Sequence, residues 1–160
     1  MDIDTICIRP FDPFLSIPKG FIMGLETGSG NMGLCNAVIM SEPRHQFLDI
    51  WLRAFADFDP DDWNKMACRR PLRIAVNHPK LIHVEGNETF FRLNWTRPEI
   101  DMLFGNLIDM PKSYSQHLWE HTSFDPYLSK LTLADIDSKG TTYNLLARKV
   151  LCDAYSQSIL

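Results

Sequence analysis

The apolar residues change their spacing abruptly near Pro43, and this change limits what the chain can fold into. Before it, residues 34–40 form a short apolar run bounded by turn residues, which is typical of a buried strand. After it, apolar residues recur at helical spacing, which predicts a helix capped by Ser41 with a core stripe formed by Phe47, Ile50, Trp51, Ala54, Phe55 and Phe58. A strand followed directly by an amphipathic helix favours a mixed α/β architecture, and 160 residues are enough for one domain.

Further strands and helices are predicted along the rest of the chain. Alternating or β-branched runs predict strands at 3–8, 21–25, 81–84, 89–93 and 114–119. Helical spacing predicts helices at 59–75, with an interruption near Pro71, at 98–105 and at 143–155. The glycine-rich residues 27–33 favour a flexible loop that lies at the rim of a site or covers it.

Composition and charge exclude several classes of protein. The chain is 45% hydrophobic and 22% charged, which excludes disorder, collagen and coiled coil. A net charge of −4 argues against a nucleic-acid partner, because phosphate binding needs a basic face. Neither a signal peptide nor a membrane anchor is visible. The cysteines contain no CxxC pair, so their spacing implies no structural zinc site and leaves disulfides open; they are Cys7, Cys35, Cys68 and Cys152.

Asp2 and Asp4 form an Asp-x-Asp pair at the start of the sequence. On an extended strand, residues i and i+2 share a face, so both carboxylates can reach one hard cation. A magnesium or manganese ion held in this way can also bind a diphosphate, whose charge it neutralises. The competing interpretation is a pair of solvated carboxylates at the end of a strand, which is the more common case for an isolated Asp-x-Asp.

The segment that contains this pair resembles part of a known family. Residues 1–12 read MDIDTICIRPFD and residues 36–45 read NAVIMSEPRH, and further matches follow at Trp63, at 71–75 (PLRIA) and at 117–119 (HLW). In this order the blocks resemble glycosyltransferase family 32, whose sugar-binding region contains a DXD motif. The resemblance extends over most of the chain. It departs at Arg69 and Arg70, where relatives have a glycine-proline nearby.

The resemblance implies a GT-A fold and a metal-dependent, retaining sugar transfer. The donor would be a nucleotide sugar, commonly UDP-linked, and the acceptor a glycan or a lipid-linked group. Asp2, Asp4 and His117 would hold the divalent cation, Mn²⁺ or Mg²⁺, and an imidazole ligand suits manganese. The alternative for His117 is a half-buried histidine bonded to backbone beside Trp119. No residue is assigned as a catalytic nucleophile.

Four residues are candidates for substrate binding. Glu26 would bind sugar hydroxyls, Asn36 would contact the donor or the acceptor, and Trp63 and Trp119 would offer indole faces to a sugar or base. Each candidate also has an ordinary structural explanation. Glu26 would be solvated, Asn36 would bond backbone in a turn before a strand, and the tryptophans would belong to the core.

In the family the DXD motif lies in the middle of the domain, whereas here it stands at residues 2–4. We therefore expect residues 1–160 to be one N-terminally truncated catalytic domain, the C-terminal half of a GT-A-like α/β domain with an incomplete sheet. The strand at 3–8 would then expose an edge and favour a homodimer.

Two other functions and the compartment stay open. One is a non-catalytic remnant that binds sugar or acts as a scaffold. The other is a phosphodiesterase-like hydrolase that uses the same acid pair, although it would need further Asp or His clusters. The family includes enzymes of the Golgi lumen and of the bacterial cytoplasm, so the resemblance does not fix the location.

Overall fold

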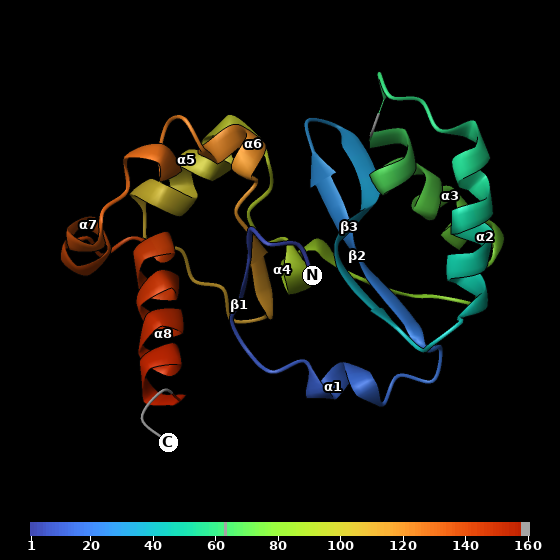
Figure 1. Cartoon of the computed structure of the whole chain (residues 1–160), viewed down its shortest axis with the longest axis horizontal. Coiled ribbons are helices and arrows are strands. Elements are labelled where there is room, and N and C mark those ends of the chain that lie inside the picture. The colour runs from blue at the N-terminus through green and yellow to red at the C-terminus, as the bar shows by residue number, and fades with distance from the viewer. Residues whose placement is uncertain (63, 158–160) are drawn as a thin grey trace.

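A computed structural model describes residues 1–62 and 64–157 and shows a mixed α/β fold with two small sheets (Figure 1). The α/β architecture predicted from the sequence is confirmed. The strands are β1 (Thr5–Cys7), β2 (Phe21–Gly28), β3 (Asn31–Ser41), β4 (His83–Glu85) and β5 (Ser115–His117). The α-helices are α1 (Asp12–Leu15), α2 (Gln46–Ala54), α3 (Arg70–Asn77), α4 (Asn87–Phe90), α5 (Arg97–Gly105), α6 (Glu120–Ser123), α7 (Leu133–Ser138) and α8 (Thr142–Gln157). Two short 3₁₀-helices, η1 (Phe55–Asp57) and η3 (Leu128–Lys130), and one π-helix, η2 (Lys65–Arg69), complete the described elements.

The larger sheet has the strand order β3-β2-β4. β2 and β3 form an antiparallel hairpin, and β4 pairs with β2 in parallel. Pairing continues to Gly28 opposite Asn31, and the two turn residues between them, Ser29 and Gly30, both have positive φ angles, 51° and 77°. This is the geometry of a tight hairpin turn. The predicted flexible loop at 27–33 is therefore wrong, because most of these residues belong to paired strands.

The larger sheet is buried on both faces because its side chains alternate between two cores. Phe21 and Met23 of β2 pack with Phe47 and Trp51 beneath α2 and α3. Ile22 points the other way, into the core that includes α4 and α5. Figure 1 shows α2 and α3 on one side of this sheet, while α4 and the two-stranded β1–β5 sheet lie on the other. The larger sheet thus lies between the core beneath α2 and α3 and the core that includes α4 and α5.

Several local predictions need correction. The predicted strand at 89–93 is wrong, since α4 extends to Phe90. The apolar run here is short, and the spacing of a short apolar run does not separate strand from helix. The helix after β3 is capped by His45, whose Nδ1 accepts from Phe47 N–H at 3.1 Å, because Ser41 still belongs to the strand. The end of the predicted core stripe is also wrong: Phe55 and Phe58 are 44% and 52% exposed.

No helix in the described part of the chain combines the length and the apolar composition needed to cross a bilayer.

Gly24 lies where the β2–β3 register shifts, and it packs directly against α4. A Cβ atom at this position would lie 2.7 Å from Phe90 Cδ2 and 2.9 Å from Phe91 Cε2, and both rings are fully enclosed. We therefore expect Gly24→Ala to lower the free energy of unfolding by about 1–3 kcal/mol, measured by urea denaturation. Gly86→Ala is the matched control, because a Cβ atom there meets nothing within 4 Å. Equal stability of the two variants would contradict this packing.

Candidate functional site

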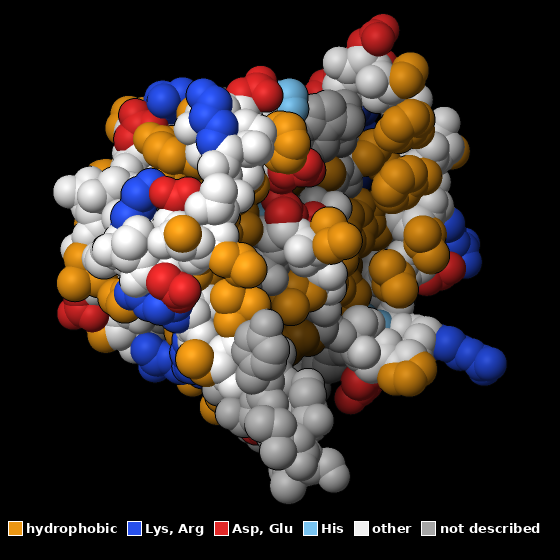
Figure 2. Space-filling view, turned by 60° about the vertical axis from the view of Figure 1, so that its left-hand side comes forward, with side chains coloured by type: hydrophobic (Ala, Val, Ile, Leu, Met, Phe, Trp, Pro, Cys, Tyr) orange, Lys and Arg blue, Asp and Glu red, His pale blue; other side chains and the backbone are white. Residues whose placement is uncertain are grey.

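A pocket of about 470 Å³ contains most of the residues singled out in the sequence. The candidates that line it are Asp2, Asp4, Glu26, Asn36, His117 and Trp119. Trp63 lies outside the described residues. Figure 2 shows acidic and hydrophobic side chains around a hollow in the molecular surface. The structure therefore brings six candidates from separate segments together, and their roles in binding stay predictions.

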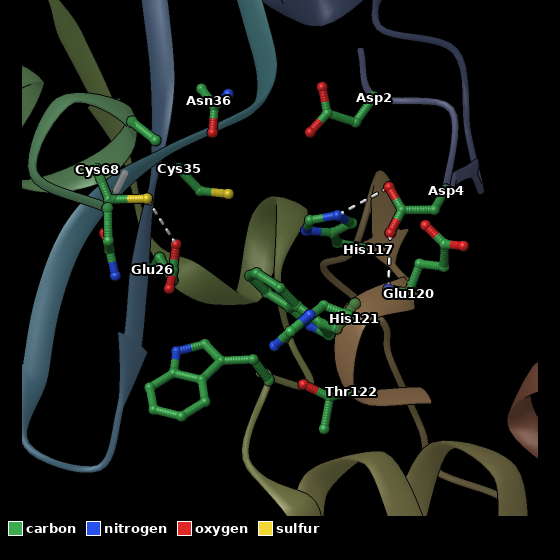
Figure 3. Close-up of a pocket in the computed structure, with 14 residues that line it drawn as sticks. Asp2, Asp4, Glu26, Cys35, Asn36, Cys68, His117, Glu120, His121 and Thr122 are labelled. Carbon is green, nitrogen blue, oxygen red and sulfur yellow. Dashed lines mark hydrogen bonds and ion pairs between the residues drawn. The ribbon is translucent and has the colours of Figure 1, made fainter. Parts of the chain in front are cut away.

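Asp2 and Asp4 lie in the turn that precedes β1 and not on the strand itself. The amide of Thr5 donates to Asp2 O at 3.2 Å and closes this turn. The amide of Asp2 donates to Ala37 O at 2.8 Å, which ties the segment to β3. The argument from strand periodicity is therefore wrong for this pair. The two carboxylates nevertheless converge, because the turn directs both toward His117, with one ligand atom from each of the three residues within 4.8 Å of the others (Figure 3).

Asp4 and His117 form the most highly connected part of this group. His117 Nε2 lies 3.0 Å from Asp4 Oδ1, and Asp4 Oδ2 accepts from the amide of Glu120 at 2.9 Å. The histidine is 9% exposed, and its ring centroid lies 4.1 Å from that of Trp119. The predicted alternative, a histidine bonded to backbone, does not occur, although its place beside Trp119 is as expected. Asp4 therefore joins the chain start to β5 and α6.

Two lining residues carry buried polar atoms with no hydrogen-bond partner among the described residues. They are His117 Nδ1 and Asn64 Oδ1. Buried polar atoms are nearly always hydrogen-bonded, so these two atoms are exceptions among the described residues. Both belong to residues around this pocket, which is consistent with a ligand-binding role for it.

The opposite wall of the pocket carries a buried group of one carboxylate and two thiols. Glu26, Cys35 and Cys68 are each less than 9% exposed, so the solvated glutamate considered above does not occur. Cys68 Sγ donates to Glu26 Oε2 at 3.2 Å. A hydrogen bond with Cys68, together with burial, raises the pKa of the Cys35 thiol far above its usual value. The Cys35 thiol is thus protonated at neutral pH in the absence of a bound cation.

The position of Cys68 depends on an unusual contact between η2 and β3. A Cβ atom on Gly33 would lie 2.7 Å from Cys68 Cβ, so only glycine lets the π-helix approach this closely. π-Helical turns are rare and are frequent at functional sites. Gly33, which was predicted to lie in a flexible loop, is therefore required for the close packing of the pocket wall.

Two tryptophans, Trp95 and Trp119, also line the pocket. Trp119 has a left-handed backbone with φ 54°, and its Nε1 donates to Leu93 O at 2.9 Å. Trp95 also lines the pocket, although it was not among the candidates taken from the sequence. Asn36 lies within β3 and not in a turn before it. The lining residues that the sequence did not indicate are Cys35, Asn64, Ala67, Cys68, Trp95, Glu120, His121 and Thr122.

His117→Ala should destabilise the fold as well as weaken any metal site. The change removes the partner of Asp4 Oδ1 and leaves a cavity beside Trp119, so we expect the free energy of unfolding to fall by about 1–3 kcal/mol in urea titrations. His121→Ala is the control, since His121 lines the same pocket but is exposed. If His117→Ala left the stability unchanged and only His121→Ala lowered it, the Asp4–His117 contact would not support the fold.

Comparison with known proteins gives one informative relative. The chain is 32% identical over 158 aligned residues to the "Glucan organizing enzyme 1" of Cryptococcus neoformans var. grubii. The alignment covers 92% of this chain and 42% of the relative, so the chain spans less than half of that protein's length. No protein-family model matches the chain, and no solved structure matches it significantly. The similarity is therefore to a part of a protein that its name describes as an enzyme.

Proposed function

We propose that this chain is the catalytic part of a metal-dependent glycosyltransferase that resembles family 32 and has a GT-A-like architecture. It would transfer a sugar with retention from a UDP-linked donor to a glycan or lipid-linked acceptor. The observation that carries the proposal is the convergence of Asp2, Asp4 and His117 at the edge of a 470 Å³ pocket. The relative supports the proposal through its name, which refers to a glucan.

The donor set of this group fits a manganese or magnesium ion. Two carboxylate oxygens suit a hard cation, and an imidazole nitrogen favours manganese. The ring of His117 also has a buried Nδ1 without a partner among the described residues. Asp2, Asp4 and His117 would hold the ion, which would supply positive charge to balance the departing diphosphate.

The protein's own residues would orient the donor and hold the ligand atoms in place. The amide of Glu120 fixes Asp4 by its bond to Oδ2, and Asp2 is held through its backbone bond to β3. Trp95 and Trp119 offer aromatic surface for the base or sugar, while Glu26 and Asn36 offer polar atoms for hydroxyl groups. No side chain is assigned as a nucleophile.

Calorimetric titration of UDP into the chain tests this proposal. We expect binding in the presence of Mn²⁺ and none that is measurable after chelation of the metal, because a pocket lined by carboxylates repels a diphosphate. Equal affinity for UDP with and without the metal would contradict the assignment. Failure of UDP to bind under both conditions would also contradict it.

A second candidate function is a sugar-binding module without catalytic activity. The two tryptophans of the pocket favour it, because indole rings bind sugar faces without a metal. Binding of glucan oligosaccharides that is insensitive to chelators, combined with no UDP binding, would establish this function in place of the transferase.

A further inference from the structure

Glu26 is a buried carboxylate without a cationic partner. Within the described residues it takes part in no ion pair, and its one side-chain hydrogen bond comes from a thiol, which is a weak donor. Carboxylates that are almost fully buried are normally paired with a cation or coordinate a metal. The surroundings of Glu26 contain two further groups that bind metal ions, the thiols of Cys35 and Cys68.

The three side chains are arranged as a set of ligands. Their ligand atoms all lie within 4.8 Å of one another. Ligands of a tetrahedral zinc ion lie roughly 3.3–3.8 Å apart, as the usual Zn–O and Zn–S bond lengths require. Small rotations of the side chains therefore close the remaining gap. Figure 3 shows this group on one side of the pocket and the group of Asp2, Asp4 and His117 on the other.

The two groups differ in the kind of cation they favour. Asp2, Asp4 and His117 offer two oxygens and one nitrogen, which suit a hard or intermediate ion. Two thiols and one carboxylate suit a softer ion of the zinc class, because thiolate sulfur binds such ions far better than it binds magnesium. One pocket therefore presents two ligand sets with opposite preferences.

We propose that Glu26, Cys35 and Cys68 form a binding site for a zinc-class divalent cation, with the fourth coordination position open to the pocket. The ion displaces the two thiol protons, which pass to solvent, so its two positive charges balance the two thiolates. The carboxylate of Glu26 then leaves the site with one net negative charge. The ligands come from β2, β3 and η2, so the bound ion also links the π-helix to the sheet. Sequence spacing could not indicate this site, because the three residues lie on separate elements.

Titration of the reduced chain with Co²⁺, which replaces zinc and absorbs light, tests the proposal. We expect one equivalent of Co²⁺ to produce the near-ultraviolet band of thiolate-to-cobalt charge transfer, and Zn²⁺ to displace it and raise the melting temperature. Cys35→Ser and Cys68→Ser should each weaken binding by more than about 100-fold, since changes even in outer-shell residues weaken metal sites by 10–100-fold. Glu26→Gln keeps both thiols and should weaken binding by at least about 10-fold.

Matched controls separate this site from the other groups of the chain. Cys7→Ser and Cys152→Ser change exposed cysteines outside the pocket and should leave the band intact. Asp2→Asn should also leave it intact, so a failure of the proposed transferase site does not affect this test. Absence of the band in the wild-type chain, or an undiminished band in folded Cys68→Ser and Glu26→Gln chains, would overturn the proposal.

Discussion

Asp4→Asn is expected to weaken Mn²⁺ binding by at least about 100-fold, equivalent to about 2.7 kcal/mol. The amide removes a charged oxygen from a site that holds a doubly charged ion. It also keeps only one acceptor oxygen, whereas the carboxylate of Asp4 serves both His117 Nε2 and the amide of Glu120. A loss of about 1 kcal/mol in folding stability should accompany the loss of metal. Titration of Mn²⁺ followed by electron paramagnetic resonance measures the affinity.

Asp2→Asn separates the metal effect from the structural effect. The Asp2 side chain is exposed and makes no hydrogen bond or ion pair with the described residues, so its change should reduce metal affinity without lowering the melting temperature. Asp109→Asn changes an exposed carboxylate outside the pocket and should alter neither quantity. If all three variants bound Mn²⁺ as the wild-type chain does, the aspartates at the chain start would not be metal ligands.

Much of the larger sheet was predictable because its strands have clear boundaries. The run at 34–40 lies between turn residues and forms β3, and the helical spacing after Pro43 produces α2. The exposed end of that stripe was not predictable, because Phe55 and Phe58 pack on each other outside the core, with ring centroids 6.2 Å apart. Apolar spacing identifies a helix face, but it does not show where the covering layer ends.

The pocket was predictable only in part, and for reasons that differ between its walls. Asp2, Asp4 and His117 were indicated by a family resemblance, whereas the physical argument for the aspartates assumed a strand that the structure replaces with a turn. Cys35 and Cys68 carry no local signal, because they are brought together by the close approach of η2 to Gly33. Contacts between distant segments of this kind depend on the tertiary fold and leave no spacing in the sequence.

Gln116 connects the pocket to the core and gave no signal in the sequence either. It is 0% exposed and lies between His117 and the turn before α5. Its Oε1 accepts from the amide of Leu93 at 3.1 Å, and its Nε2 donates to Leu93 O at 2.7 Å and to His117 O at 2.8 Å. Leu93 O also accepts from Trp119 Nε1. The Gln116 side chain therefore holds His117 in place, and the Leu93 carbonyl holds Trp119.

Gln116→Leu should therefore lower the free energy of unfolding by about 3–5 kcal/mol, because it leaves the amide of Leu93 and the carbonyl of His117 buried without these partners. Denaturation by urea measures this change, and Gln46→Leu, at the exposed start of α2, is the matched control. Any Mn²⁺ affinity of the chain should fall in the same variant, since His117 lies next to the altered residue. A loss of less than about 1 kcal/mol would mean that water reaches these backbone groups, in which case Gln116 does not position the pocket.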